Sequence, residues 1–271
     1  MKAEYKLKIP LIGLGTYKLL GHKCEKVIKE ALAIGYRHFD TAHAYENHQA
    51  VGKGLKGFDR EKLFITSKIA LEQVKDEKIM QSVDKACDKA LKELGMDYLD
   101  LYLIHWPDRE RPMIEILEAM NGLIKTGKVL HVGVSNYTIH HLKDALDAKL
   151  KVECNQVEFH PYLYQKELLQ FCTQEGICLV SYRPFGKGEL LDEEPAFAEV
   201  GKKHGKSGAQ VILRWCVQKN IPVIPKASSK KHLEENFAIF DFSLTAKEMQ
   251  ALDRLNKNFR YCEIDTAEFD Y

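Results

Sequence analysis

Four polar side chains in the first half of the chain have the types and spacing needed to reduce a carbonyl group. They are Asp40, Tyr45, Lys68 and His105. Hydride addition places negative charge on a carbonyl oxygen, which must then be stabilised and protonated. Tyr45 could donate this proton, although a free phenol has a pKa of about 10. A neighbouring Lys68 ammonium would favour the phenolate and so lower that pKa.

The remaining two side chains complete this chemistry. Asp40 would keep Lys68 charged and in place, and His105 could bind the substrate oxygen and orient it towards Tyr45. Each residue alone has a simpler interpretation. Asp40 could cap a helix and Lys68 could be a solvated loop residue. His105 could be a hydrogen-bonded core histidine, and Tyr45 an ordinary aromatic residue in a loop. Their joint placement at the ends of successive predicted strands favours the catalytic interpretation, because barrel enzymes carry their chemistry there.

Short β-rich segments alternate with helical periodicity along the whole chain. The predicted strands cover residues 9–13, 38–42, 63–69, 99–105, 129–135, 152–159, 178–182 and 221–224. A repeat of about thirty residues is typical of βαβ units. We therefore expect an α/β protein with the (β/α)8 TIM barrel fold, forming one domain over residues 1–271. An open dinucleotide-binding sheet is disfavoured, because residues 13–18 lack the third glycine of its fingerprint.

Several helix boundaries can be predicted from capping patterns. An apolar stripe predicts a helix over residues 79–94, with Asp76 as its N-cap, and a second helix is expected over residues 114–125. Ser207 with Gln210, and Thr245 with Glu248, have the spacing of capping boxes. Both pairs are expected to open helices.

The composition excludes several classes of function. The net charge of +1 gives no electrostatic basis for binding nucleic acid or an anionic membrane. The seven cysteines are scattered and include no CxxC pair, which favours reduced core thiols over disulfides or a metal site. No signal peptide or membrane-spanning stretch is evident. We expect a cytoplasmic monomer that acts on a small-molecule carbonyl substrate.

Three long motifs carry a resemblance to a known family. Residues 35–47, 120–136 and 224–236 resemble, in this order, three motifs of the aldo-keto reductases. The chain is similar to prokaryotic-type members with short loops, such as 2,5-diketo-gluconate and aldehyde reductases. The resemblance implies the same four catalytic residues and an NADP(H) cofactor across the barrel mouth. It also implies a set of cofactor-binding residues: Gly15, Thr16, Asp40, Ser135, Asn136, Gln156, Tyr182, Lys226, His232, Glu235 and Asn236.

The implied roles differ along the cofactor. Gly15 and Thr16 would border the nicotinamide end, Tyr182 would stack on the ring, and the carboxamide would be held by Ser135, Asn136 and Gln156. Lys226 would contact the 2′-phosphate, while Glu235 and Asn236 would meet the adenine. Asn136 as a helix cap and Gln156 as a polar strand residue remain structural alternatives.

Two departures from the family pattern bear on cofactor choice. His232 stands where many members have an arginine, and Ala227 stands where a hydroxyl residue is common. A neutral imidazole is a weaker partner for an anion than a guanidinium. Lys230 and Lys231 could compensate. We therefore hypothesise a preference for NADPH with unusually good tolerance of NADH. A third departure, His48, replaces a frequent glutamate and is interpreted as a surface helix position.

The substrate pocket is expected to be aromatic and open. Tyr17, Trp106 and Phe185 lie beside the proposed site in sequence and could line it together with Tyr45 and His105, although packing at the barrel rim explains them equally well. The segment after His105 and the tail after residue 255 are both short. Short versions of these segments suggest a permissive site for small aldehydes, ketones or sugar-derived carbonyls.

Three other functions compete with carbonyl reduction. A Schiff-base lyase would use Lys68 as nucleophile, but this requires a neutral lysine, which Asp40 opposes. A metal-dependent hydrolase needs ligands at strand ends, and His38, His43 and His48 do not form a convincing set. A non-catalytic cofactor-binding subunit would not need the complete set of four catalytic residue types.

Overall fold

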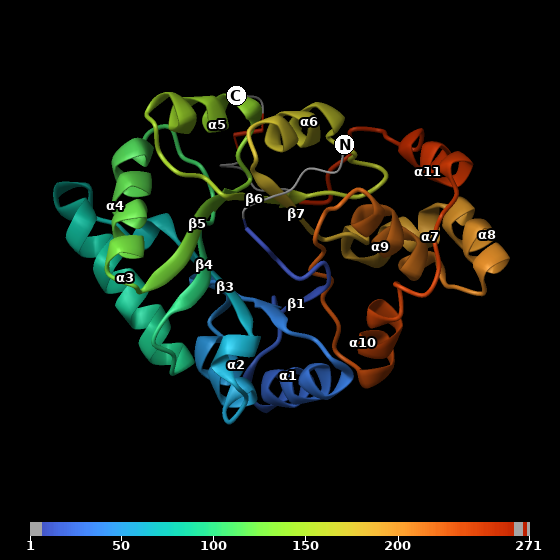
Figure 1. The fold of residues 1–271 in the computed structure, drawn as a ribbon, viewed down its shortest axis with the longest axis horizontal. Helices are drawn as coiled ribbons and strands as arrows, with labels where there is room; N and C mark the ends of the chain where they lie inside the picture. Colours follow the sequence, from blue (N-terminus) through green and yellow to red (C-terminus); the bar gives the residue numbers. More distant parts are fainter. Residues whose placement is uncertain (1–6, 263–267, 270–271) are drawn as a thin grey trace.

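Seven parallel strands form most of a closed barrel in the computed structural model, which describes residues 7–262 and 268–269. Neighbouring strands in the sheet are consecutive in the chain, and every pair runs parallel. Figure 1 looks along the barrel and shows the helices around it. The strands are β1 Gly13–Gly15, β2 His38–Asp40, β3 Phe64–Ile69, β4 Leu99–Ile104, β5 Val129–Ser135, β6 Cys154–Glu158 and β7 Cys178–Tyr182. This arrangement confirms the prediction of a (β/α)8-type barrel.

The place of the eighth strand is taken by residues 221–226, which pair through single bridges. Val223 bridges both Ile12 and Ser181, and Lys226 bridges Gly15. These contacts join β7 to β1 and close the barrel. The predicted first strand, residues 9–13, is wrong in its boundaries, because regular pairing begins only at Gly13. Pro10 lies in the predicted range and has no N–H to donate to a strand ladder.

Gly15 allows the two ends of the barrel to meet. A Cβ at this position would lie only 2.6 Å from the backbone oxygen of Ile224. Real Cβ atoms do not approach a carbonyl oxygen so closely, so a larger residue would push the closing segment away from β1. The glycine is therefore needed for residues 221–226 to pack closely against β1 and close the barrel. It lies directly beside the strand ends that carry the polar residues.

The helices follow the strands and cover the outside of the barrel (Figure 1). They are α1 Gly21–Ile34, α2 His48–Leu55, α3 Ile79–Leu94, α4 Met113–Lys125, α5 Ile139–Asp147, α6 Lys166–Gln174, α7 Glu189–Glu193, α8 Pro195–His204, α9 Gly208–Gln218, α10 Lys230–Phe237 and α11 Ala246–Asp253. The predicted helices over residues 79–94 and 114–125 correspond to α3 and α4. Asp76 does not cap α3; it belongs to a 3₁₀ turn, where its carboxylate accepts a hydrogen bond from Arg111 at 2.7 Å.

Both predicted capping boxes are confirmed. Ser207 opens α9 and Thr245 opens α11, each accepting from the backbone N–H three residues on. A third box opens α5, where His141 takes the place of the usual glutamate or glutamine and hydrogen-bonds with Thr138. The usual sequence pattern, which specifies Glu or Gln, does not detect this helix start.

The barrel interior is mainly apolar near its floor, where the buried His38 packs against Phe64 and hydrogen-bonds with Thr66, and it is polar at its mouth. A small core cluster inside the barrel includes Phe64, Leu101, Leu103 and Cys154. Because side chains alternate along a strand, Lys68 on β3 points to the same side as Phe64, into the barrel. All seven cysteines are free and buried. No helix within the described part of the chain has the length and apolar character needed to cross a membrane.

Candidate active site

Lys68 lies at the centre of a buried hydrogen-bond cluster at the carboxyl ends of the strands. Its ammonium nitrogen lies 2.6 Å from Asp40 Oδ1, 3.1 Å from the backbone oxygen of Thr41 and 3.3 Å from Tyr45 Oη. The side chains of Lys68 and Asp40 are 0% and 2% exposed. The ammonium therefore donates all of its hydrogens to this cluster and has no free position for solvent.

Strand alternation and one short turn bring these groups together. Asp40 ends β2 and Lys68 is near the end of β3, and both project into the barrel. Tyr45 ends a 3₁₀ turn that begins at His43. Glu46 follows in the left-handed region with φ of 53° and turns the chain towards α2. Because the turn has only three residues, it brings Tyr45 Oη back to the strand ends, next to Lys68.

Asn47 fixes this turn, and sequence reasoning did not identify its role. The side chain is 2% exposed. Its amide donates to Thr16 and to the backbone oxygen of Leu19, and its oxygen accepts from the Thr41 hydroxyl at 2.6 Å. Asn47 thus ties the Tyr45 turn to the loop after β1. The one available signal was its place at the end of the first family motif.

Burial and charge act against each other on the ionisable groups of this cluster. Burial would lower the pKa of Lys68, but the Asp40 carboxylate and Tyr45 outweigh it and raise this pKa above its ordinary value. Burial raises the pKa of Tyr45, and Lys68 acts in the opposite direction without reversing the result. Lys68 thus lowers the pKa of Tyr45, as the sequence predicts, but burial has the larger effect and the resulting pKa is raised. Tyr45 is a neutral acid in this structure.

His105 follows β4 and lies beside Tyr45. Its ring meets that of Tyr45 edge-on, with 5.7 Å between the ring centroids. Burial, with a smaller contribution from the Lys68 charge, lowers the pKa of His105 to about 3. The imidazole is therefore neutral at physiological pH and offers one N–H to an oxygen placed between it and Tyr45.

A chain of amides and hydroxyls connects the next strand ends to Asp40. Tyr182 donates to Asn136 Oδ1 at 2.7 Å, and Asn136 donates to Ser135 Oγ at 3.0 Å. Ser135 donates to the backbone oxygen of Gln156, whose side-chain amide donates to Asp40 Oδ2 at 2.7 Å. Ser135, Gln156 and Tyr182 belong to β5, β6 and β7, and Asn136 directly follows β5. Asn136 has φ of 66°, a left-handed conformation that asparagine tolerates well.

The opposite side of the mouth is basic. Lys226 is exposed, and its pKa is lowered by partial burial and by the nearby ammonium groups of Lys23 and Lys18. Thr16 is fully buried and donates to the backbone oxygen of Asp40 at 2.9 Å. The predicted adenine-side residues lie on α10, where His232 is exposed, Glu235 is partly buried and Asn236 is buried.

Comparison with known proteins agrees with this geometry. A sequence model of the Aldo/keto reductase family matches residues 11–257. The chain belongs to the aldo-keto reductase family. A relative named glyoxal reductase from Bacillus subtilis is 43% identical over 264 residues, covering 96% of this chain and 94% of the relative.

Solved structures of family members share the fold. One titled a putative 2,5-diketo-D-gluconic acid reductase B matches with a TM-score of 0.87 and 37% identity, covering 92% of this chain and 88% of the other. The aldose reductase from Schistosoma japonicum matches with a TM-score of 0.86 and 32% identity, covering 95% and 93%. Oxidoreductase membership is thus established for the chain, and its prokaryotic-type character is supported.

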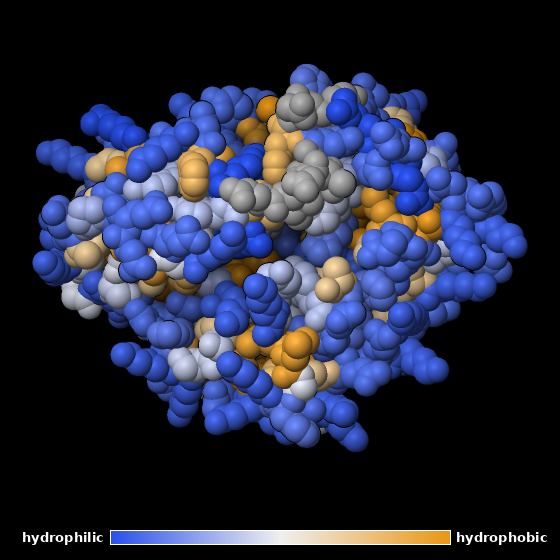
Figure 2. Space-filling model, turned by 180° about the vertical axis from the view of Figure 1, so that it is seen from behind, coloured by the Kyte–Doolittle hydropathy of each residue, from blue (hydrophilic) through white to orange (hydrophobic). Residues whose placement is uncertain are grey.

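Aromatic side chains surround the four catalytic candidates in this aldo-keto reductase. The rings of Tyr17 and Tyr45 are 5.1 Å apart, and Trp106 stacks on His105 at 6.2 Å. Tyr17 is 45% exposed and forms part of the rim. Phe185 is partly buried and packs against the main hydrophobic core. Figure 2 views this side of the barrel, opposite to Figure 1, and shows a hollow near the middle of the face.

His48 corrects one sequence-based interpretation. It is 3% exposed and lies at the start of α2, facing β3 instead of solvent. Its ring contacts Ser67 Oγ at 2.9 Å and Glu93 Oε2 at 3.1 Å. These two partners satisfy both ring nitrogens, which is why a histidine can be buried in this family member. Within the described residues, no group of three or more potential metal ligands converges on a point.

Proposed function

We propose that this aldo-keto reductase reduces small aldehydes and ketones to alcohols with NADPH, and that Tyr45 donates the proton. The observation that supports this is the contact of the buried Lys68 ammonium with both Tyr45 Oη and Asp40. This contact places a fixed positive charge next to the oxygen that loses a proton. The glyoxal reductase of Bacillus subtilis, at 43% identity, favours small reactive carbonyls as the substrate class.

Each of the four catalytic candidates has a separate role at the carbonyl oxygen of the substrate. A reduced nicotinamide, when bound, supplies the hydride that goes to the carbonyl carbon. The neutral His105 donates a hydrogen bond to the oxygen and directs it towards Tyr45. Tyr45 transfers its proton to this oxygen, and Lys68 stabilises the phenolate that remains. Asp40 keeps Lys68 protonated throughout.

The donor set at the mouth suits a phosphorylated dinucleotide. The amides of Asn136 and Gln156 and the hydroxyl of Ser135 include both donors and acceptors, as a carboxamide requires, and would exchange some of their present bonds to neighbouring groups for bonds to it. On the opposite side, the ammonium groups near Lys226 suit the extra phosphate of NADPH. His232 is exposed and replaces a guanidinium that would bind this phosphate in two places. We therefore propose NADPH preference with substantial use of NADH.

The hydrogen bonds of Lys68 disfavour the alternative of a Schiff-base lyase. A lysine nucleophile needs a free electron pair, whereas Lys68 donates to Asp40, Thr41 and Tyr45. Its raised pKa keeps it protonated at neutral pH. Borohydride trapping of a substrate on Lys68 would favour the lyase again.

The decisive experiment compares the protein with its Tyr45→Phe variant. Consumption of NADPH is followed by absorbance with a reactive aldehyde, and cofactor binding is followed by fluorescence. We expect turnover to fall by about 10²- to 10⁴-fold, the usual contribution of a general acid, while NADPH still binds. Unaltered turnover in the variant would contradict the role of Tyr45. Binding of NADPH by the wild type without any turnover would favour a non-catalytic cofactor-binding subunit.

The cofactor proposal has a separate test in Lys226→Ala. The variant removes one ammonium group from the basic side of the mouth and leaves the catalytic cluster intact. We expect KM for NADPH to rise by about tenfold, the loss of one charge-assisted hydrogen bond, and KM for NADH to change little. NADH thus serves as the internal control. A wild-type protein that strongly prefers NADH would refute the proposal.

A further inference from the structure

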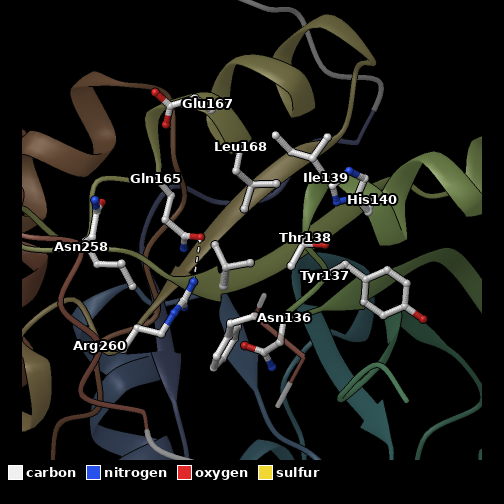
Figure 3. Close-up of a pocket in the computed structure, with 13 residues that line it drawn as sticks. Asn136, Tyr137, Thr138, Ile139, His140, Gln165, Glu167, Leu168, Asn258 and Arg260 are labelled. Carbon is white, nitrogen blue, oxygen red and sulfur yellow. Dashed lines mark hydrogen bonds between the residues drawn. The ribbon is translucent and has the colours of Figure 1, made fainter. Parts of the chain in front are cut away.

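A cavity adjoins the candidate active site, and none of its lining residues belongs to the cluster around Lys68. Its volume is about 380 Å³, and it lies between the first turns of α5 and α6 and the C-terminal segment (Figure 3). Two lining residues connect it to the site. Asn136 donates to the backbone oxygen of His105 at 3.0 Å, and Phe269 packs on Trp106 with 6.0 Å between ring centroids. The cavity therefore lies beside the strand ends that carry His105 and Asn136, next to the place where a carbonyl would be reduced.

Arg260 is the one lysine or arginine among the described residues that line this cavity. Its side chain donates to Gln165 Oε1 at 3.2 Å, and its guanidinium carbon lies 3.7 Å from the centre of the Phe269 ring. The guanidinium is half-buried, and no carboxylate of the described residues lies within ion-pair distance of it. Burial lowers the pKa of Arg260, and the more distant Glu158 carboxylate acts in the opposite direction without reversing the result. A half-buried guanidinium with one conventional hydrogen bond keeps most of its donor positions for another partner.

The rest of the cavity suits an acidic organic molecule. Val157, Leu163 and Leu168 provide apolar walls. Glu167, the acidic residue of the lining, is exposed, and Figure 3 shows its carboxylate directed away from Arg260. Nearby, Arg109 differs from Arg260, because it is already paired with Glu268 at 3.0 Å. The positive charge of Arg260 thus remains available inside a mainly apolar pocket.

We propose that Arg260 binds the carboxylate of the substrate, so that this enzyme prefers carbonyl compounds that carry an acid group. The planar guanidinium can donate two parallel hydrogen bonds to a carboxylate, a geometry that a lysine cannot reproduce. The apolar walls would hold the carbon skeleton between the acid group and the reacting carbonyl. This inference rests on the proposed carbonyl reduction and adds its substrate class. Arg260 is a specificity-determining residue in this scheme.

The test uses matched substrates that differ in one charge. 4-Carboxybenzaldehyde and 3-carboxybenzaldehyde are each compared with their neutral methyl esters. We expect the wild type to prefer the acids in kcat/KM. Arg260→Gln should lower kcat/KM for the preferred acid by about 10- to 100-fold, the range for losing charge-assisted hydrogen bonds, and leave the esters within about twofold. Arg260→Lys should recover only part of the loss.

Controls separate this inference from general damage and from failure of the proposed function. Lys257→Gln removes one positive charge from the same segment, outside the cavity lining, and should leave the preference unchanged. Equal losses for acid and ester in Arg260→Gln, or no acid preference in the wild type with either isomer, would overturn the inference. If no aldehyde is reduced, carbonyl reduction fails instead. In that case, binding of 4-(hydroxymethyl)benzoate and of its methyl ester is measured by calorimetry. Loss of binding of the acid in Arg260→Gln supports the site. Equal binding of the acid by the wild type and the variant overturns it.

Discussion

Replacing Asp40 by asparagine tests the electrostatic core of the site. The variant keeps the shape of the side chain but removes the negative charge 2.6 Å from Lys68 Nζ. At this distance the attraction between two unit charges is about 6 kcal/mol with an effective dielectric constant of about 20. Part of this only offsets the burial of both charges. Loss of one partner from a buried pair typically costs about 3–5 kcal/mol, and we expect Asp40→Asn to destabilise the fold by that amount at neutral pH.

The pH dependence of this loss follows from Lys68. In the wild type the pKa of Lys68 is raised, so its contribution to stability is fully present below the pKa of a free lysine, about 10.4, and is lost as the pH rises through the folded value. Without the Asp40 carboxylate, we expect burial to outweigh the contribution of Tyr45 and to lower the pKa of Lys68 below that of free lysine. Stability of the variant should then increase as the pH rises towards about 10.4, and the difference from the wild type should shrink.

Urea unfolding of four proteins provides the measurement: wild type, Asp40→Asn, Lys68→Met and the double variant. The double variant has no buried charge to compensate, so it should recover at least about 2 kcal/mol relative to Asp40→Asn. Activity should be strongly reduced in all three variants. The reasoning is refuted if Asp40→Asn costs less than about 1 kcal/mol at neutral pH, or if its penalty grows with increasing pH.

Three further changes test elements that position the site. Gly15→Ala places a Cβ 2.6 Å from the Ile224 oxygen and should cost about 1–3 kcal/mol with a matching loss of cofactor affinity; thermal unfolding without any change would contradict the role in closure. Ser207→Ala removes the cap of α9 and should cost about 1 kcal/mol while kcat remains unchanged, as measured by urea unfolding and steady-state kinetics. His48→Leu leaves the buried Ser67 hydroxyl without its partner and should cost about 1–3 kcal/mol; a more stable variant would show that the buried contact is dispensable.

Much of the scaffold could be predicted because it depends on local patterns. The strand–helix alternation and the boxes at Ser207 and Thr245 are encoded by neighbouring residues, and the structure agrees with them. The first strand was misplaced because barrel closure joins segments far apart in the chain, at Gly15 and residues 221–226. Parts of the C-terminal tail used to predict an open pocket, residues 263–267 and 270–271, lie outside the described residues.

The candidate site shows the same division. Polar residue types at strand ends were enough to select Asp40, Tyr45, Lys68 and His105, because strand periodicity and barrel architecture together determine which side chains reach the mouth. Sequence pattern could not reveal the partners that reach them from distant segments.

The sequence by itself therefore determined the family, the barrel and the residue types of the candidate site. The tertiary structure decided which groups are buried and what they contact. It placed His48 between Ser67 and Glu93, and it placed Arg260 beside a cavity about one hundred and fifty residues from His105 in sequence. The physical reason is that burial and electrostatic pairing depend on contacts between segments far apart in the chain, whereas helix and strand patterns depend on neighbours.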